Sequence, residues 1–192
     1  MKRRVFVAIN IPAAAKEKIG EEVEKIKLVF ERQNFFGCRF APPKNLHLTI
    51  SFLGYQDDNG VALIADAVGK IAKKFENPLV IFDKIIYGPP KGTPRMIWLS
   101  GSEKTSKDLA EIKNHLENLL LENGVGFQQE NRPYSTHLTL ARFETTPKTS
   151  LPAIEKDFRI EFSAKNLNFM ESHLKKTGAE YEPLASFNFI GE

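Results

Sequence analysis

Two histidine motifs stand out in this 192-residue chain. The segment His47-Leu48-Thr49-Ile50 is followed, 90 positions later (137 minus 47), by His137-Leu138-Thr139-Leu140. Each copy alternates polar with apolar side chains, which is the period of a β-strand. In such a strand the histidine and the threonine share one face, while the apolar residues between them anchor the other face in a core. Each copy therefore offers an imidazole beside a hydroxyl.

Two such strands facing each other would supply a general acid, a general base and two neutral hydrogen-bond donors. An imidazole has an unperturbed pKa near ~6.5, so one ring can be charged at neutral pH while the other is neutral. The neutral ring takes a proton from water, the charged ring protonates the departing oxygen, and the hydroxyls stabilise charge on the phosphoryl oxygens. The repeat thus indicates hydrolysis of a phosphodiester without a metal.

Other catalytic classes lack the residues that they need. A zinc site takes three or four protein ligands, and neither motif carries a second histidine or a carboxylate close by. The sequence contains no Gly-x-Ser-x-Gly elbow and no Walker-type phosphate loop. We therefore expect no metal and no cofactor. A single His-Leu-Thr motif would favour a structural role. A catalytic role is favoured because a second copy places its histidine and threonine on one strand face in the same way.

Four residues near the motifs are candidate substrate contacts. Arg95 and Arg142 can each hold a phosphate through a bidentate pair, although an ideal strand turns Arg142 away from His137 unless a bulge re-aims it. Phe52 and Tyr134 flank the motifs and can stack on a base. For each arginine, the competing interpretation is a solvated position on the surface. For Phe52, packing in the core is favoured over contact with a base.

Composition is that of a globular protein, with 42% hydrophobic residues and a net charge of +3, which favours an anionic partner. We expect residues 1–192 to form a single two-lobed domain. The lone Cys38 excludes a disulfide framework and is expected to be a partly buried hydrophobe. The basic, then apolar N-terminus is too short for a signal peptide, and no segment is long enough to span a membrane. A cytoplasmic protein is expected.

Hydrophobic periodicity predicts a mixture of helices and strands in both halves of the chain. We expect helices over about residues 12–33, 61–75 and 104–123, and strands over 5–11, 47–53 (ending at Gly54), 79–86, 96–99, 137–140, 158–162, 167–170 and 187–190. The strongest break is the proline-rich segment 88–94. With the motif repeated in each half, this order predicts an α+β fold. Two antiparallel sheets with approximate two-fold symmetry would flank a central groove, with the helices outside.

The residues around the motifs resemble a known family. The segment from Pro42 to Gly54 is similar to the first motif of the two-histidine phosphoesterases, in the branch called 2′-5′ RNA ligase or RNA 2′,3′-cyclic phosphodiesterase. The resemblance extends to the second motif through Arg142, to Arg95 with Trp98, and to the segments 4–9 and 172–181. One departure is Thr136, which stands where relatives often have proline.

The resemblance implies a bilobal fold and hydrolysis of RNA 2′,3′-cyclic phosphate ends to 2′-phosphomonoesters, with reversible 2′-5′ ligation as a side activity. It implies that His47 donates a proton to the leaving 3′ oxygen and that His137 is the base that activates water. Thr49 and Thr139 would hold the phosphoryl oxygens. We expect a monomer that acts on RNA ends and needs no membrane. Two alternatives stay open, an RNA-end-binding module without turnover and a phosphodiesterase for small cyclic nucleotides.

Overall fold

The computed structural model describes residues 2–130, 132–145, 150–175 and 178–191. The helices are α1 (Ala13–Arg32), α2 (Asp58–Ala72) and α3 (Glu103–Glu122), and a 3-10 turn, η1, covers Pro43–Asn45. The strands are β1 (Arg3–Asn10), β2 (Cys38–Phe40), β3 (His47–Gln56), β4 (Leu79–Gly88), β5 (Met96–Gly101), β6 (His137–Phe143), β7 (Lys156–Ser163), β8 (Asn166–Lys175) and β9 (Gly178–Asn188). Among these helices, none has the length and apolar character needed to cross a membrane.

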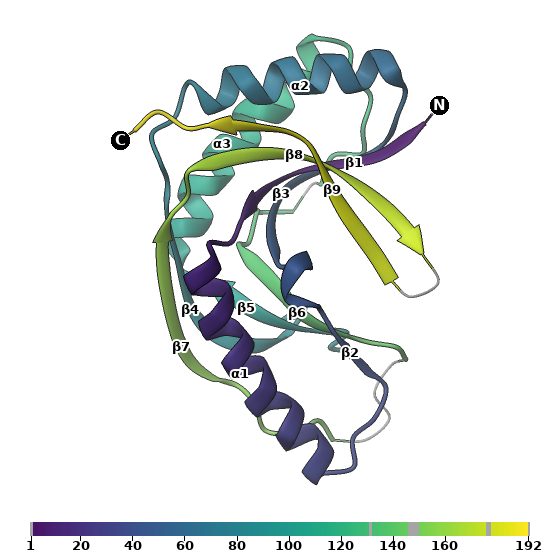
Figure 1. The fold of residues 1–192 in the computed structure, drawn as a ribbon, viewed down its shortest axis with the longest axis vertical. Helices are drawn as coiled ribbons and strands as arrows, with labels where there is room; N and C mark the ends of the chain where they lie inside the picture. The colour runs from purple at the N-terminus through teal and green to yellow at the C-terminus, as the bar shows by residue number, and fades with distance from the viewer. Residues whose placement is uncertain (1, 131, 146–149, 176–177, 192) are drawn as a thin grey trace.

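The strands form two antiparallel sheets, and each sheet contains one motif strand. A four-stranded sheet has the order β3-β1-β8-β9, and a five-stranded sheet has the order β2-β6-β5-β4-β7. Figure 1 shows the four-stranded sheet in the upper half of the molecule and the five-stranded sheet in the lower half. The motif strands β3 and β6 come together where the two sheets meet. This is the predicted α+β architecture with two antiparallel sheets.

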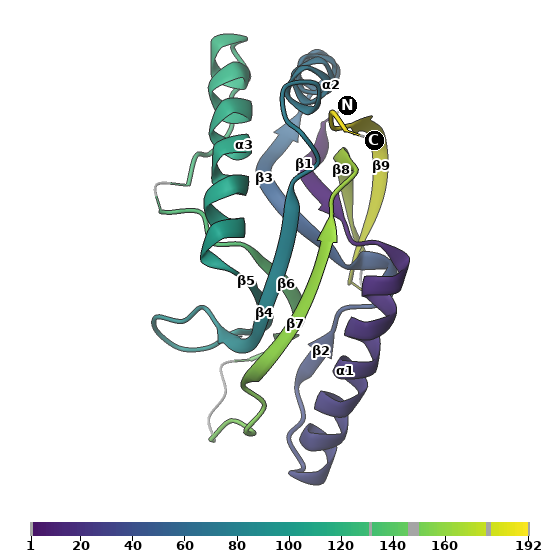
Figure 2. The ribbon, with the colours of Figure 1, turned by 90° about the vertical axis from the view of Figure 1, so that its left-hand side faces the viewer.

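The helices cover the outer faces of the sheets, as predicted (Figure 2). The apolar stripe of α1 packs on the five-stranded sheet, where the Phe30 ring stacks on Phe143 with 6.5 Å between centroids. Helix α2 lies on the four-stranded sheet, and Gly69 leaves room there for the Phe187 ring. Asp57 caps α2 by accepting a hydrogen bond from the N–H of Gly60 (2.8 Å). The burial of these stripes is what holds the amphipathic helices in place.

The two halves share more than the motifs. The bounds of α3 lie 90 positions after those of α1, the same displacement as between the two histidines (103 minus 13; 137 minus 47). Each of these helices precedes its motif strand along the chain. The approximate two-fold symmetry therefore relates a strand, a helix and a motif strand in each half.

The strands differ from the prediction at several places. Strand β3 continues to Gln56 because Gly54, at φ +69°, belongs to an irregularity in the pairing with β1 and not to a chain reversal. Strand β9 begins at Gly178 instead of 187, because its first half carries charged and exposed residues without an apolar alternation. The three-residue strand β2 was missed, because so short a segment has no periodicity to detect.

Candidate active site

Each motif histidine is the first residue of its strand, and a backbone carbonyl two residues earlier fixes its ring. Nδ1 of His47 lies 2.7 Å from the carbonyl oxygen of Asn45, and Nδ1 of His137 lies 2.8 Å from that of Ser135. A carbonyl oxygen can only accept, so each Nδ1 carries a hydrogen and donates it. In both copies Nε2 is then the nitrogen left to exchange a proton with a substrate. Both side chains are half-buried.

A β-bulge in β6 reverses the alternation after the second motif. The pairing with β5 skips one residue between Thr139 and Ala141, and this residue is Leu140. Leu140 and Ala141 are both buried, and the next residue, Arg142, is exposed. Arg142 therefore lies on the face of His137 and Thr139. The bulge that was needed to re-aim this arginine is present.

The same bulge occurs in β3, after the first motif. The pairing with β1 skips Ile50 between Thr49 and Ser51, and Ile50 and Ser51 are both buried. Phe52 is consequently turned to the face of His47, with 52% of its surface exposed. The prediction that Phe52 packs in the core was wrong, because it depended on an unbroken alternation through the strand.

Phe52 and Arg142 thus occupy equivalent places in the two sheets, each five residues after its histidine. One lobe presents an aromatic ring, which suits a nucleobase, and the other presents a guanidinium, which suits a phosphate. Nη1 of Arg142 lies 3.0 Å from Sδ of Met96, which is a weak acceptor. Among the residues that the structure describes, the other donors of this guanidinium make no hydrogen bond, so they are available to a ligand.

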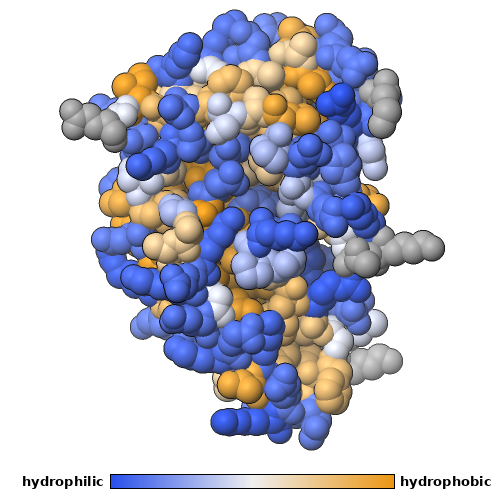
Figure 3. Space-filling view, viewed as in Figure 1, coloured by the Kyte–Doolittle hydropathy of each residue, from blue (hydrophilic) through white to orange (hydrophobic). Residues whose placement is uncertain are grey.

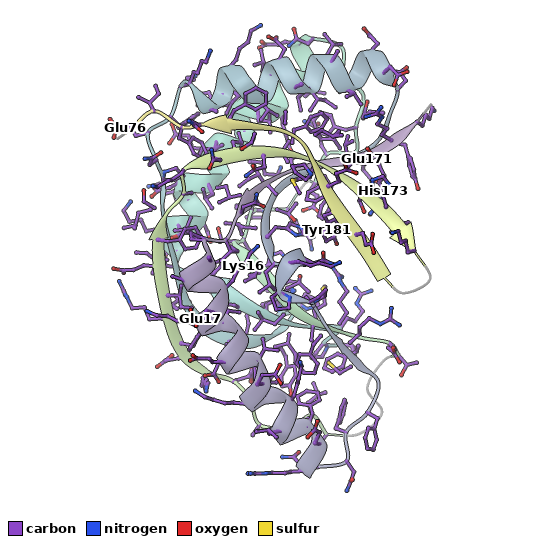
Figure 4. All side chains as sticks on the ribbon, in the orientation of Figure 1. Lys16, Glu17, Glu76, Glu171, His173 and Tyr181 are labelled. Atoms are coloured by element: carbon purple, nitrogen blue, oxygen red, sulfur yellow. The ribbon has the colours of Figure 1, made fainter. Side chains whose placement is uncertain are left out.

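Aromatic side chains hold both imidazole rings from the sides. The ring of His137 stacks on Trp98, with 4.0 Å between centroids and 24° between planes. The centroid of the His47 ring lies 5.0 Å from that of Phe6 and, in a T-shaped arrangement, 4.7 Å from that of Tyr181. Figure 4 shows Tyr181 on β9, above the short turn that precedes β3. Each ring is thus fixed by a hydrogen bond from Nδ1 and by packing against aromatic side chains.

The pKa values of both imidazoles are lowered from 6.5. Burial is the main cause for each ring, and it is opposed by the carbonyl that accepts from Nδ1. The positive charge of Arg142 lowers the pKa of His47 and of His137, so this guanidinium lies within electrostatic reach of both rings. Lys16 adds to the effect at His47, and Arg132 adds to it at His137. An anion bound among these cations would raise both pKa values again.

Hydrogen bonds from other elements fix the position of β3. The hydroxyl of Tyr134 donates to the carbonyl oxygen of Thr49 at 2.7 Å, which joins the segment before β6 to the first motif. At the bulge, the hydroxyl of Ser51 donates to Glu117 of α3 at 2.6 Å, and the other carboxylate oxygen of Glu117 accepts from Lys113 at 2.7 Å. The hydroxyl of Tyr134 therefore supports the backbone of Thr49, and stacking of its ring on a base stays a prediction.

Thr136, the departure from the usual proline, makes a contact that proline cannot make. Its N–H donates to the hydroxyl of Ser106 at 3.1 Å, and proline has no N–H. Its carbonyl oxygen accepts from the N–H of Gly101 at 2.8 Å. The residue before the second histidine is therefore held by hydrogen bonds to α3 and to the end of β5.

The structure adds residues that sequence reasoning missed. Arg39 of β2 is the register partner of Arg142 and pairs with Glu144 at 3.1 Å, so two arginines share the inner face of the five-stranded sheet. Lys16 is in the first turn of α1. In the view of Figure 4, the short turn before β3 lies between Lys16 and Tyr181. No signal in the sequence pointed to Arg39, because the strand that positions it, β2, is too short to show a periodicity. The predicted contact Arg95 is exposed beside the start of β5, where its N–H donates to the carbonyl of Gly88 at 2.7 Å.

The surface between the two sheets is indented and mostly hydrophilic in the space-filling view (Figure 3). Within the described ranges, no three histidine, cysteine, aspartate or glutamate side chains are grouped so that they could hold a metal ion. The thiol of Cys38 is partly buried, and burial raises its pKa to about 12, so it is protonated at neutral pH and a poor nucleophile. The two imidazoles, both within electrostatic reach of Arg142, remain as the candidate acid and base.

Comparison with known proteins agrees with this geometry. The family model described as LigT-like phosphoesterase matches residues 12–98. An RNA 2′,3′-cyclic phosphodiesterase of Methanocaldococcus jannaschii is 32% identical over 93% of this chain and 96% of its own length. Another, of Thermotoga maritima, is 29% identical over 98% of this chain and 96% of its own. The crystal structure of TT0787 of Thermus thermophilus superposes with a TM-score of 0.80 at 26% identity, covering 98% of this chain and 99% of that one.

Proposed function

The chain belongs to the LigT-like phosphoesterase family, and we propose that it hydrolyses the 2′,3′-cyclic phosphate at the end of an RNA to a 2′-phosphomonoester. The observation that carries the proposal is the pair of imidazoles with the same tautomer, the same position in their strands and one guanidinium within reach of both. This arrangement supplies an acid, a base and a positive charge for one phosphate, from protein groups alone.

The reaction uses the two free Nε2 atoms on opposite sides of phosphorus. Neutral His137 takes a proton from water, and the water oxygen attacks phosphorus in line with the bond to the 3′ oxygen. That bond breaks, and protonated His47 gives its Nε2 proton to the 3′ oxygen, which leaves as a hydroxyl. The 2′ oxygen keeps the phosphate. If the 5′ hydroxyl of another RNA replaces water, the same steps form a 2′-5′ bond.

Threonine hydroxyls and Arg142 stabilise the charge that builds on the phosphoryl oxygens during attack. Thr49 and Thr139 each lie two residues after their histidine, on the same face of the strand, and their hydroxyls donate to the two non-bridging oxygens. Arg142 supplies the countercharge. A phosphate bound there also raises the pKa of the nearby imidazoles, which favours the singly protonated pair that the mechanism requires. Phe52 is placed to stack on the base of the terminal nucleotide.

The test is turnover of a 5′-labelled RNA that ends in a 2′,3′-cyclic phosphate. The wild-type protein should convert it to a phosphomonoester, and the His47→Ala and His137→Ala variants should be nearly inactive. Binding of the RNA without conversion would instead establish a binding module. Turnover of cyclic mononucleotides together with failure on every RNA would establish a small-nucleotide phosphodiesterase.

A further inference from the structure

The face of the four-stranded sheet that carries His47 extends well past the histidine. The Phe6 ring lies 5.0 Å from His47, 5.9 Å from Phe52 and 5.2 Å from Tyr181, so these four side chains share one face. Phe6 and Tyr181 are packed against each other there, whereas Phe52 is half exposed. The face is therefore an aromatic floor that starts at the first motif.

Register and one hydrogen bond extend this face to Tyr55 and Arg4. Ser172 is the pairing partner of Tyr181, and the guanidinium of Arg4 donates to the hydroxyl of Ser172 at 2.9 Å. Arg4 thus lies on the His47 face, and its own pairing partner is Tyr55. Paired residues of neighbouring strands place their side chains on the same side of a sheet. Tyr55 is 61% exposed, so its ring is open to solvent beside a cation.

The direction of the reaction determines which part of an RNA lies over this face. Water attacks from the side of His137, and the 3′ oxygen leaves toward His47. The ribose that holds this oxygen, with its base, is therefore on the side of the four-stranded sheet. The RNA chain continues from the 5′ oxygen of the same ribose. Nucleotides upstream of the cyclic phosphate must then pass over the sheet face that begins at His47 and Phe52.

Resting on the proposed function, we propose that Tyr55 and Arg4 form a subsite for the nucleotide that precedes the terminal one. Tyr55 stacks on its base, and Arg4 contacts the phosphodiester that links it to the terminal nucleotide. The partners of Phe52 and Tyr55 on β1 are Phe6 and Arg4, two residues apart, which corresponds to about 7 Å along the strand. This is about twice the ~3.4 Å rise of a stacked strand, so the two rings can hold two different bases.

An exposed aromatic ring beside an arginine is a common platform for single-stranded RNA, because a base stacks on the ring while the cation meets the backbone. Removing such a ring costs a factor of about 5 to 150 in affinity per base. The subsite would make the protein prefer an RNA end over a cyclic mononucleotide. It would do so with little sequence preference, because every base has a face that can stack.

The experiment compares kcat/KM for a 2′,3′-cyclic mononucleotide with kcat/KM for di- and trinucleotides that have the same terminal nucleotide. Wild type should prefer the longer substrates. Tyr55→Ala should reduce that preference by about 5- to 150-fold, whereas Tyr55→Phe should retain it. Arg4→Gln should reduce both the preference and its sensitivity to salt. The matched control is Arg159→Gln, an exposed, ion-paired arginine on β7, which should leave both rates unchanged.

Equal efficiency of wild type on mono- and trinucleotides would overturn the subsite and leave the proposed function intact. A preference that persists in both Tyr55→Ala and Arg4→Gln would also overturn it, as would a loss of equal size on every substrate, which indicates damage to the fold. If wild type hydrolyses none of them, the proposed function fails. The same RNAs with a 2′-phosphate end then test the subsite by binding, where Tyr55→Ala should weaken only the longer ones.

Discussion

Arg142 is the residue whose replacement tests the site most informatively, because its charge reaches both imidazoles and its donors are largely free. The substitution Arg142→Gln keeps a polar side chain of similar length and removes the charge. One hydrogen bond to a charged group contributes about 1.5–3 kcal/mol. We therefore expect kcat/KM for an RNA cyclic phosphate to fall about 10- to 150-fold. Because Arg142 is exposed, the free energy of unfolding should change by less than about 0.5 kcal/mol.

The pH dependence of the same variant gives a second, directional result. In wild type, burial and nearby cations lower the pKa of both histidines, so the bell-shaped profile of kcat/KM should have its maximum below pH ~6.5. On the alkaline side the rate falls as the acid loses its proton, and on the acidic side it falls as the base gains one. Loss of the Arg142 charge raises both pKa values, so both limbs should move to higher pH.

The assay is the initial rate on a short RNA with a 2′,3′-cyclic phosphate, measured at constant ionic strength from pH 4.5 to 9. Arg159→Gln is the control, because it removes one exposed positive charge from β7 and should leave the rate and the profile unchanged. A slower Arg142→Gln enzyme whose limbs stay in place, or move to lower pH, would refute the inferred electrostatic coupling to the histidines.

Three further predictions follow from the same site. His47→Ala and His137→Ala should each lower kcat by ~10²–10⁴, and the double variant should be little worse, because acid and base act together; additive losses would contradict the pairing. Tyr134→Phe removes the hydroxyl that supports Thr49, so urea unfolding should show a loss of about 1 kcal/mol, and an unchanged midpoint would contradict that role. Prolonged chelation should leave the rate unaltered, since the proposed chemistry uses imidazole, hydroxyl and guanidinium groups; activity that is lost to chelator and restored by zinc would overturn it.

Much of the fold could be predicted from the sequence, because its helices and most of its strands carry clear apolar periods. The burial of Leu48 and Ile50, and of Leu138 and Leu140, follows the predicted alternation. The bulges could not be predicted, because an unpaired residue in a strand does not change the types of residue from which a strand is recognised. They are what turn Phe52 and Arg142 toward the histidines.

The neighbours of the motifs were less predictable than the motifs themselves. Tyr181 of β9 contacts His47 of β3, at the opposite edge of the four-stranded sheet. Arg39 lies beside Arg142 because the three-residue strand β2 pairs with β6. Both contacts join segments far apart in the chain, so they depend on tertiary structure alone. The contact of Tyr134 with the backbone of Thr49 also joins distant segments, and stacking of its ring on a base stays a prediction.

The most direct test of the mechanism is the position of the phosphate in the product after one turnover in water enriched in oxygen-18. An RNA ending in a 2′,3′-cyclic phosphate should give a 2′-phosphate that contains one oxygen-18 atom, together with an unlabelled 3′ hydroxyl. That result requires attack by water at phosphorus and departure of the 3′ oxygen, which are the steps assigned to His137 and His47. A 3′-phosphate product, or label in the ribose hydroxyl, would contradict this assignment.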